Sequence, residues 1–287
     1  MSRADARAEL PDLALAARKR LVARTFGAAA STYDEHARVQ RSVAAELARR
    51  AAGLTLPPQP QVLEIGCGTG FLTALLRERW RAAQLVATDL AEPMVARCRA
   101  KLGAVVVGSP AVWVRPVVMD GEWPALRHAS HDLVVASLAF QWFAALGPAL
   151  TRLARCLAPG GTLLFATLGA DTFREWRATH EALGLRHGVP PLPSADALRA
   201  ALPAQALGEV DEAWHALHYS SGRAFLEALR AAGAHVPAAG HVPLAPSQMR
   251  RVLHALEGHG EVRVTYHVLY ARWQAPGPRP SPGGTRR

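Results

Sequence analysis

The sequence predicts an α/β protein with a Rossmann-like, mostly parallel sheet, an antiparallel final strand, helical insertions and an N-terminal helical segment. Three observations predict this fold. Short apolar runs alternate with helical stretches between residues 61 and 168, as parallel strands covered by helices on both faces do. A glycine-rich loop follows the first of these runs. The segment 261–273 alternates β-branched and aromatic residues with polar ones, which is typical of a closing strand.

The elements follow one another in a regular order. Residues 1–60 have Ala-rich helical periodicity and close with the breaker at residues 57–60. The strands that we expect next are Gln61–Ile65, Gln84–Asp89, Val112–Met119, Asp132–Ser137 and Thr162–Thr167. The helices between them are Phe71–Trp80, Glu92–Leu102 and Pro148–Leu157. Pro116 cannot donate to a ladder, so the third strand should lie at an edge of the sheet.

The pattern changes after residue 170. Residues 171–206 show helical periodicity with a proline-rich break at residues 190–193. Val210–Tyr219 is a candidate strand, and the candidate helices are Arg223–Ala232 and Ser247–Glu257. The tail from Ala275 is rich in Pro and Gly, which predicts disorder.

Composition limits the classes of protein. The 287 residues suffice for one large domain with insertions, and no apolar run is long enough to span a membrane. Three cysteines without a C-x-x-C pair, and histidines without ligand spacing, argue against disulfides and metal. Without a signal peptide pattern, we expect a cytoplasmic protein. The net charge of +10 favours an acidic partner, although an Arg-rich and Ala-rich composition also produces it.

The loop after the first strand carries the strongest chemical signal. It runs Glu64-Ile65-Gly66-Cys67-Gly68-Thr69-Gly70, a G-x-G-x-G spacing with an acid before the first glycine. A dinucleotide loop would have G-x-G-x-x-G, and a P-loop would end in Gly-Lys-Ser/Thr. The tighter loop suits a ligand with a nucleoside part and an amino-acid part, which predicts S-adenosylmethionine as the cofactor.

Two acids at the ends of the next strands support this prediction. Asp89 ends the second strand, where its carboxylate can accept hydrogen bonds from both ribose hydroxyls. Asp120 follows the third strand beside Gly121 and is placed to meet the adenine amino group. The carboxyl ends of adjacent parallel strands form one crevice, which is the usual ligand site of an open α/β sheet. Alone, Asp89 could equally cap the following helix.

With these motifs, residues 61–168 resemble the class I S-adenosylmethionine-dependent methyltransferases. The resemblance implies that the loop glycines lie under the methionine part of the cofactor, that Asp89 binds ribose and that Asp120 binds adenine. The candidate cofactor-binding residues are Glu64, Gly66, Cys67, Gly68, Gly70, Asp89, Leu90, Asp120, Gly121 and Ser137.

A narrower resemblance extends over most of residues 24–273. Five segments resemble the malonyl-[acyl-carrier protein] O-methyltransferases of biotin synthesis: Phe26–Gln40, Leu138–Trp142, Thr167–Glu175, Leu229–Ala234 and Thr265–His267. The resemblance implies methylation of the free carboxylate of a malonyl group on an acidic acyl carrier protein. It also implies that Tyr33 lies near the transferred methyl group, where we expect it to be catalytic.

The chemistry needs few groups. A carboxylate is ionised near neutral pH, so methyl transfer to it requires no general base. A cation should orient the substrate carboxylate, and Arg174 and Arg230 are candidates, unless they are solvated helix charges. Gln141 and Trp142 are candidates for the wall of the acceptor site, although tryptophans more often fill cores.

By these expectations the chain has five parts: an N-terminal helical lid (1–60), a cofactor-binding methyltransferase core (61–170), helical insertions with one core strand that cover the substrate (171–259), the closing strand (260–274) and a tail (275–287).

Other functions remain open at this point. The chain could methylate a small free carboxylic acid, or could be a non-methylating member of the fold such as a hydroxylase of the assembly-factor type. A binding module that keeps the cofactor site is a third possibility. Nucleic acid is disfavoured as a substrate, because Ser137-Leu138-Ala139-Phe140 stands where an amino-methylating enzyme would have Asn-Pro-Pro-Tyr.

Overall fold

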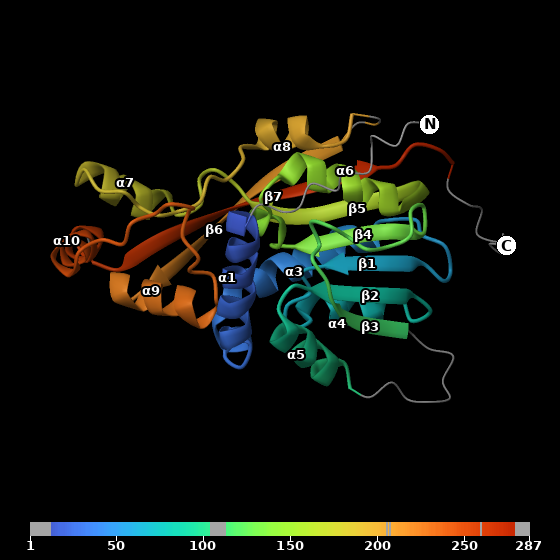
Figure 1. Ribbon diagram of the computed structural model, residues 1–287, viewed down its shortest axis with the longest axis horizontal. Coiled ribbons are helices and arrows are strands. Elements are labelled where there is room, and N and C mark those ends of the chain that lie inside the picture. Colours follow the sequence, from blue (N-terminus) through green and yellow to red (C-terminus); the bar gives the residue numbers. More distant parts are fainter. Residues whose placement is uncertain (1–12, 104–112, 205, 207, 259, 279–287) are drawn as a thin grey trace.

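A computed structural model describes residues 13–103, 113–204, 206, 208–258 and 260–278 of the chain. They form one seven-stranded sheet in the order β3-β2-β1-β4-β5-β7-β6 (Figure 1). Strands β1 to β5 are parallel, and β7 runs antiparallel to both of its neighbours, β5 and β6. The predicted fold class is therefore confirmed, and β3 occupies the edge that Pro116 indicates.

The elements have the following bounds. The strands are β1 Gln61–Ile65, β2 Gln84–Asp89, β3 Trp113–Val118, β4 His131–Ser137, β5 Leu157–Leu168, β6 Gly208–Tyr219 and β7 Val262–Gln274. The helices are α1 Leu13–Ala29, α2 Tyr33–His36, α3 Arg38–Ala52, α4 Phe71–Arg79, α5 Glu92–Leu102, the 3₁₀ turn η1 Phe140–Trp142, α6 Leu146–Cys156, α7 Arg174–Ala182, α8 Ala195–Ala201, α9 Gly222–Ala231 and α10 Pro246–Glu257.

The central strands are mostly apolar because helices cover both of their faces. Alternate residues of a strand point to opposite faces. On β1, Val62 belongs to the cluster that α3 and α4 cover, whereas its neighbour Leu63 packs under α6 and α8. Both side chains are fully buried. These strands therefore lack the regular alternation of polar and apolar residues that a half-exposed strand shows, and apolar residues form most of their sequence.

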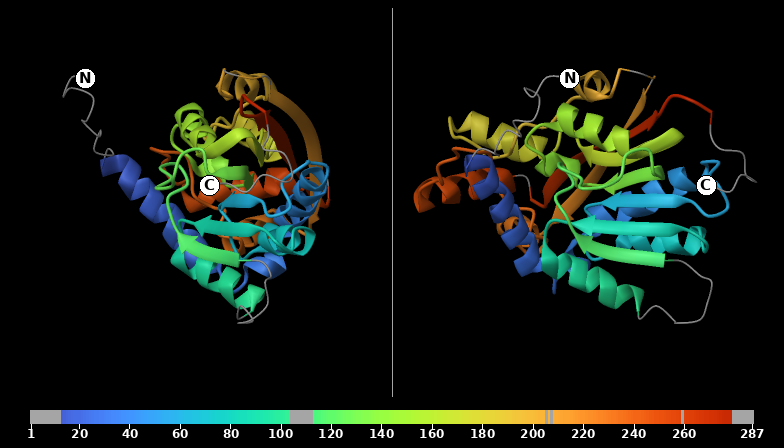
Figure 2. Two further views of the ribbon diagram at one scale, coloured as in Figure 1. Left: turned by 90° about the vertical axis from the view of Figure 1, so that its right-hand side faces the viewer. Right: turned by 45° about the vertical axis from the view of Figure 1, so that its right-hand side comes forward.

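The N-terminal helices lie outside the sheet and close its ligand-binding end. Helix α3 packs against α4, and α1 packs against α5, as Figures 1 and 2 show. A Cβ at Gly27 of α1 would lie 3.2 Å from Pro93 of α5, so the two helices approach closely. Helices α1 and α2 both contribute to the wall of the main cavity, and their role as a lid stays a prediction.

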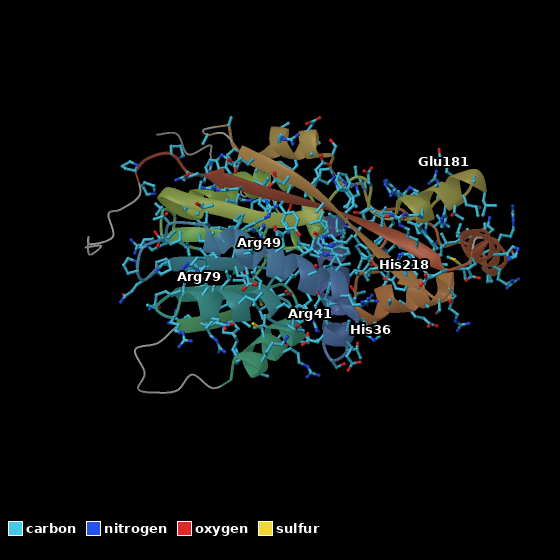
Figure 3. All side chains as sticks on the ribbon, turned by 180° about the vertical axis from the view of Figure 1, so that it is seen from behind. His36, Arg41, Arg49, Arg79, Glu181 and His218 are labelled. Carbon is cyan, nitrogen blue, oxygen red and sulfur yellow. The ribbon has the colours of Figure 1, made fainter. Side chains whose placement is uncertain are left out.

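Strands β6 and β7 extend beyond the parallel sheet and carry α7, α9 and α10 at their far end (Figure 1). In Figure 3, Glu181 of α7 and His218 of β6 lie at this end, away from Arg49 and Arg79. Rings from three elements pack edge to face here: Phe173 lies 5.4 Å from Phe225 and 4.9 Å from Tyr266, centroid to centroid. The insertions thus share a core with the sheet.

Most expected boundaries agree with the structure to within two residues, and strand β5 and the tail differ more. Strand β5 begins at Leu157, not at Thr162, because His131 already pairs with Leu157 across a register shift. Helix α6 begins two residues earlier than expected, at Leu146. The start of the expected disordered tail is ordered, since Ala275 N donates to Gly161 O and Gly160 N donates to Pro276 O. The rest of that prediction, from residue 279, lies outside the described residues.

Two further findings concern expected features. In the described part of the chain, no helix is long and apolar enough to cross a membrane. Cys67, Cys98 and Cys156 are buried and free.

Candidate active site

The glycine loop needs its glycines for two separate reasons. Gly66, Gly68 and Gly70 all have positive φ, of 71°, 53° and 92°. Only glycine adopts this region without cost. A Cβ at Gly66 would lie 2.4 Å from the Cβ of Ala139, and a Cβ at Gly70 would lie 2.9 Å from Cys98 Sγ. The loop therefore turns sharply while it packs tightly against η1 on one side and α5 on the other.

Asp89 joins the glycine loop to α5. Its Oδ2 accepts a hydrogen bond from Gly68 N at 2.9 Å, and its Oδ1 accepts one from Ala91 N at 2.8 Å. Burial raises the pKa of Asp89, although backbone donors act against this shift. Since each carboxylate oxygen accepts more than one hydrogen bond, the side chain can cap α5 and still accept hydroxyls from the cavity that it lines.

Helix α2 is tied to the same loop by a polar cluster that sequence reasoning missed. Asp34 Oδ1 accepts a short hydrogen bond from Thr69 Oγ1, and Asp34 Oδ2 lies 2.7 Å from Lys101 Nζ. Partial burial acts to raise the pKa of Asp34, but hydrogen bonds from Lys101 and Thr69 outweigh it and lower the pKa. Spacing alone could not identify this cluster, because its members are far apart in sequence.

A second missed cluster closes the end of the site that lies after β3. Lys19 Nζ of α1 lies 2.5 Å from Asp120 Oδ2 and 2.7 Å from Glu122 Oε2. Glu122 is buried, and its Oε1 accepts the N–H groups of Ala144 and Ala145. Lys19 therefore fastens the lid helix to two carboxylates at the carboxyl end of β3.

These elements enclose the first cavity, which has an empty volume of about 740 Å³. Of the candidate cofactor-binding residues, those lining it are Gly66, Gly68, Asp89, Leu90, Asp120, Gly121 and Ser137. The described lining does not include Glu64, Cys67 or Gly70. Gly121 is confined as well, since a Cβ there would lie 2.3 Å from Ile65 Cγ2.

The first cavity fits the ligand that the sequence predicts. Asp89 and Asp120 can accept hydrogen bonds from ribose and adenine, while Met94, Met119 and Phe143 offer apolar contacts to a base. The rings of Phe26, Tyr33 and Trp142 line the same cavity, and aromatic faces attract a cation such as a sulfonium.

A second cavity adjoins the first. Phe26, Tyr33, Leu138 and Trp142 line both cavities, and the second has an empty volume of about 660 Å³. Its wall is mainly apolar, with Gln40, Gln141, Thr172 and the tyrosines as polar members. Among the described residues that line it, none is Lys or Arg. All five segments of the narrower sequence resemblance contribute to this one wall.

The structure brings some predicted acceptor residues together and leaves others apart. Trp142 and Gln141 line the second cavity, as expected. Gln141 is oriented by its Nε2 donating to Leu138 O at 2.6 Å. Arg174 is exposed and belongs to a different pocket, and Arg230 is exposed at the end of α9, with its neighbour Leu229 facing the cavity. The spacing of residues along a helix did not show which side of the helix faces the cavity.

Tyr33 stands between the two cavities. Burial raises its pKa, with further upward contributions from Asp89 and Asp34. The hydroxyl therefore stays protonated at neutral pH and is a hydrogen-bond donor, not a base. In the described residues, no three His, Cys, Asp or Glu side chains gather at a distance that could hold a metal ion.

Glu64 lies beneath the loop as a buried acid, and burial raises its pKa to about 8. A raised pKa means that the folded protein holds this proton more tightly than the unfolded chain. Glu64 should therefore cost no stability below pH 4.5 and should destabilise the fold increasingly as the pH rises toward 8.

We expect Glu64→Gln to remove this dependence. Between pH 5 and pH 8 the wild-type chain should lose a few kcal/mol more unfolding free energy than the variant, as urea titrations at the two pH values would measure. Equal losses in both proteins would show that Glu64 is ionised in the folded state.

Comparisons with known proteins agree with this geometry. Residues 63–165 match the family model described as methyltransferase domain. The malonyl-[acyl-carrier protein] O-methyltransferase of Magnetococcus marinus is 43% identical over 263 residues, which cover 91% of this chain and 94% of that protein. The biotin biosynthesis bifunctional protein BioCD of Bordetella avium is also 43% identical, over 90% of this chain. The match spans 53%, about half, of that longer protein.

Solved structures show the same fold at low sequence identity. A putative methyltransferase from Bacillus halodurans superposes with a TM-score of 0.57 at 14% identity, covering 82% of this chain and 99% of that one. The putative methyltransferase solved with the Trm112 activator of Haloferax volcanii superposes with a TM-score of 0.53 at 17% identity, covering 90% of this chain and 99% of that one.

Proposed function

Since the chain belongs to the family of the malonyl-[acyl-carrier protein] O-methyltransferases, we propose that it methylates the free carboxylate of a malonyl thioester on an acyl carrier protein. S-adenosylmethionine is the methyl donor, and the methyl ester that forms can start pimeloyl and biotin synthesis. The first cavity holds the cofactor, and the second cavity holds the malonyl group. The protein acts in the cytoplasm with an acidic carrier protein as its partner and without metal.

One observation carries this proposal more than any other. The five segments that resemble the family are dispersed between residues 26 and 267, yet each contributes side chains to the second cavity. That cavity shares four residues with the first, so a group bound there lies next to the cofactor. A shared wall between a nucleoside site and an acyl site is the arrangement that direct transfer between two bound molecules requires.

The residues have simple tasks in this reaction. S-adenosylmethionine, when bound, supplies a methyl group on a positively charged sulfur. When an oxyanion attacks the methyl carbon, the carbon–sulfur bond breaks and the sulfur leaves as a neutral thioether. A carboxylate is already ionised at neutral pH, so no residue has to remove a proton from it. The rings of Phe26, Tyr33 and Trp142 exclude water from the junction of the two cavities, and they favour the cationic reactant.

The substrate carboxylate is oriented by neutral donors in this proposal. Tyr33, Tyr266 and Gln40 line the second cavity, and each carries a group that can donate a hydrogen bond. Hydrogen bonds from such groups can hold one oxygen while the other attacks, without neutralising it. Arg174 and Arg230 do not line the second cavity. Neither is therefore proposed as the cation that orients the substrate carboxylate.

Tyr33→Phe tests the junction of the two cavities. We expect kcat to fall by about tenfold to a hundredfold, because one donor to the reacting carboxylate is lost, while the Kd for S-adenosylmethionine stays within about twofold. Turnover assays and calorimetry measure the two quantities. Tyr270→Phe is the matched control, because Tyr270 is also buried but lines neither cavity. A similar loss of kcat in both variants would mean that Tyr33 acts through packing.

The decisive experiment is an acceptor panel with methyl-labelled S-adenosylmethionine. We expect label in the ester of malonyl carrier protein, less in that of malonyl-coenzyme A and little in that of free malonate. Equal labelling of free malonate would favour a small-acid methyltransferase. Absence of label in every acceptor, in protein that binds the cofactor, would favour a non-methylating member of the fold.

A further inference from the structure

A third, open pocket lies on the extension of β6 and β7, beside the second cavity. It is formed by α7, the loop 184–189 that follows this helix and the loop 238–241. Its empty volume is about 1390 Å³. Val189 lines this pocket and the second cavity, so the two hollows meet at that side chain. We call it the basic pocket.

Charge sets the basic pocket apart from the two cavities. Arg174, Arg177 and Arg186 line it, and Glu181 is the one acidic side chain among its described lining residues. Arg174 Nε lies 3.4 Å from Glu175 Oε1, but Glu175 also accepts from the N–H and the hydroxyl of Thr265. The pocket thus carries an excess of positive charge, and such a hollow attracts an anion.

One histidine of the basic pocket, His187, adds a donor in its neutral form. Burial lowers the pKa of His187, and the nearby Arg177 and His241 lower it further. His187 Nδ1 accepts the N–H of Val189 at 3.0 Å, so the neutral ring carries its proton on Nε2. His187 can therefore donate a hydrogen bond without adding charge.

The two loops of the basic pocket hold each other in place. Ala238 N donates to Gly188 O at 2.8 Å, and Trp176 Nε1 donates to His187 O at 3.1 Å. Gly188 has a φ of 71°, and a Cβ there would lie 2.9 Å from the ring of His241. The close approach of the loops thus depends on a glycine, and the pocket is formed before any ligand binds.

We propose that the basic pocket binds the phosphate of the arm that carries the acyl thioester, and that the arm passes Val189 into the second cavity. This inference rests on the proposed function. A carrier protein presents its acyl group at the end of a phosphopantetheine arm, which is thin and ends in an anionic phosphodiester. Guanidinium groups match phosphate oxygens in geometry and charge. The order of the hollows, basic pocket, second cavity, first cavity, places phosphate, acyl group and cofactor in the sequence that transfer needs.

Arg186→Glu tests the phosphate site with two soluble arms, malonyl-phosphopantetheine and malonyl-pantetheine. With the wild-type protein, the phosphorylated arm should bind about tenfold more tightly by calorimetry and show a correspondingly lower KM, which corresponds to about 1.4 kcal/mol. In Arg186→Glu this difference should disappear, whereas kcat and the Kd for S-adenosylmethionine should not change. Arg186 is exposed, so the variant should fold.

Arg97→Glu is the matched control. Arg97 is exposed on α5 and lines none of the three hollows, and its replacement changes the net charge by the same amount. It should leave the preference for the phosphorylated arm intact. Equal binding of both arms by the wild-type protein, or an equal effect of the two variants, would overturn the phosphate site.

Val189→Phe tests the passage independently of charge. The larger side chain should narrow the junction and lower turnover of both arms by about tenfold or more, without weakening cofactor binding. Unchanged turnover would show that the acyl group enters elsewhere, which would overturn the proposed route. Calorimetry measures arm binding directly, so it tests the phosphate site even if the protein methylates no acceptor. A lack of methylation would contradict only the proposed function.

Discussion

Gly66→Ala should abolish most cofactor binding. The new methyl group would lie 2.4 Å from Ala139 Cβ, far inside van der Waals contact, at a backbone φ of 71°. The left-handed conformation costs about 1–2 kcal/mol for alanine, and overpacking costs about 1–3 kcal/mol more. The loop should shift away from η1, and we expect calorimetry to show at least about a thirtyfold weaker Kd for S-adenosylmethionine, which corresponds to about 2 kcal/mol.

Two further variants separate the clash from the backbone strain. Gly184, which follows α7, has nearly the same φ, 66°, but nothing lies within 4 Å of a Cβ placed on it. Gly184→Ala should therefore lower stability by about 1–2 kcal/mol and leave the cofactor Kd unchanged. Adding Ala139→Gly to Gly66→Ala removes the clashing methyl group and should restore part of the affinity. If the double variant binds no better than Gly66→Ala alone, the steric explanation is wrong.

Lys19→Met should destabilise the whole fold and weaken cofactor binding. Glu122 Oε2 forms an ion pair with Lys19 Nζ at 2.7 Å and has no hydrogen-bond partner among the described residues. Removing the ammonium leaves a buried carboxylate without a counterion, which costs about 2–4 kcal/mol for a pair in which Lys19 is partly exposed. Chemical unfolding should report this loss. The Kd for S-adenosylmethionine should rise about tenfold, because Asp120 loses the cation that orients it.

A second substitution provides the control for charge. Glu122→Gln in the Lys19→Met background removes the orphaned charge while its amide oxygen can still accept from Ala144 and Ala145, so most of the stability should return. The chain's other described lysine pair is more exposed, and Lys101→Met should therefore cost about 1 kcal/mol or less. If Lys101→Met costs as much as Lys19→Met, burial of Glu122 does not explain the effect.

The acceptor side of the site was predictable only in part. The resemblance indicated Tyr33, Gln141 and Trp142, which the structure brings to the wall of one cavity. Arg174 and Arg230 were chosen because a carboxylate usually has a cation. Each lies on the exposed side of its element, with Phe173 and Leu229 turned inward instead. A sequence shows that a helix has two faces, but which face meets a cavity depends on the neighbouring elements.

Local patterns determined the sheet and the cofactor loop. Apolar runs without alternation predicted parallel strands, Pro116 predicted the edge strand, and the spacing of Gly66, Gly68 and Gly70 with Asp89 predicted the nucleoside site. These signals are local because strand burial, proline chemistry and positive φ are properties of one residue and its near neighbours. A single sequence is sufficient for them.

Only the tertiary structure decided which distant charges meet. Lys19 reaches Asp120 and Glu122 across about a hundred residues, and Asp34 joins Thr69 and Lys101. It also decided that the arginines of α7 and the loop after it gather in a pocket that meets the second cavity at Val189. The packing of helices on the sheet sets these distances. Coulomb energies depend on the distance in space and on burial, and the spacing of residues along the chain predicts neither.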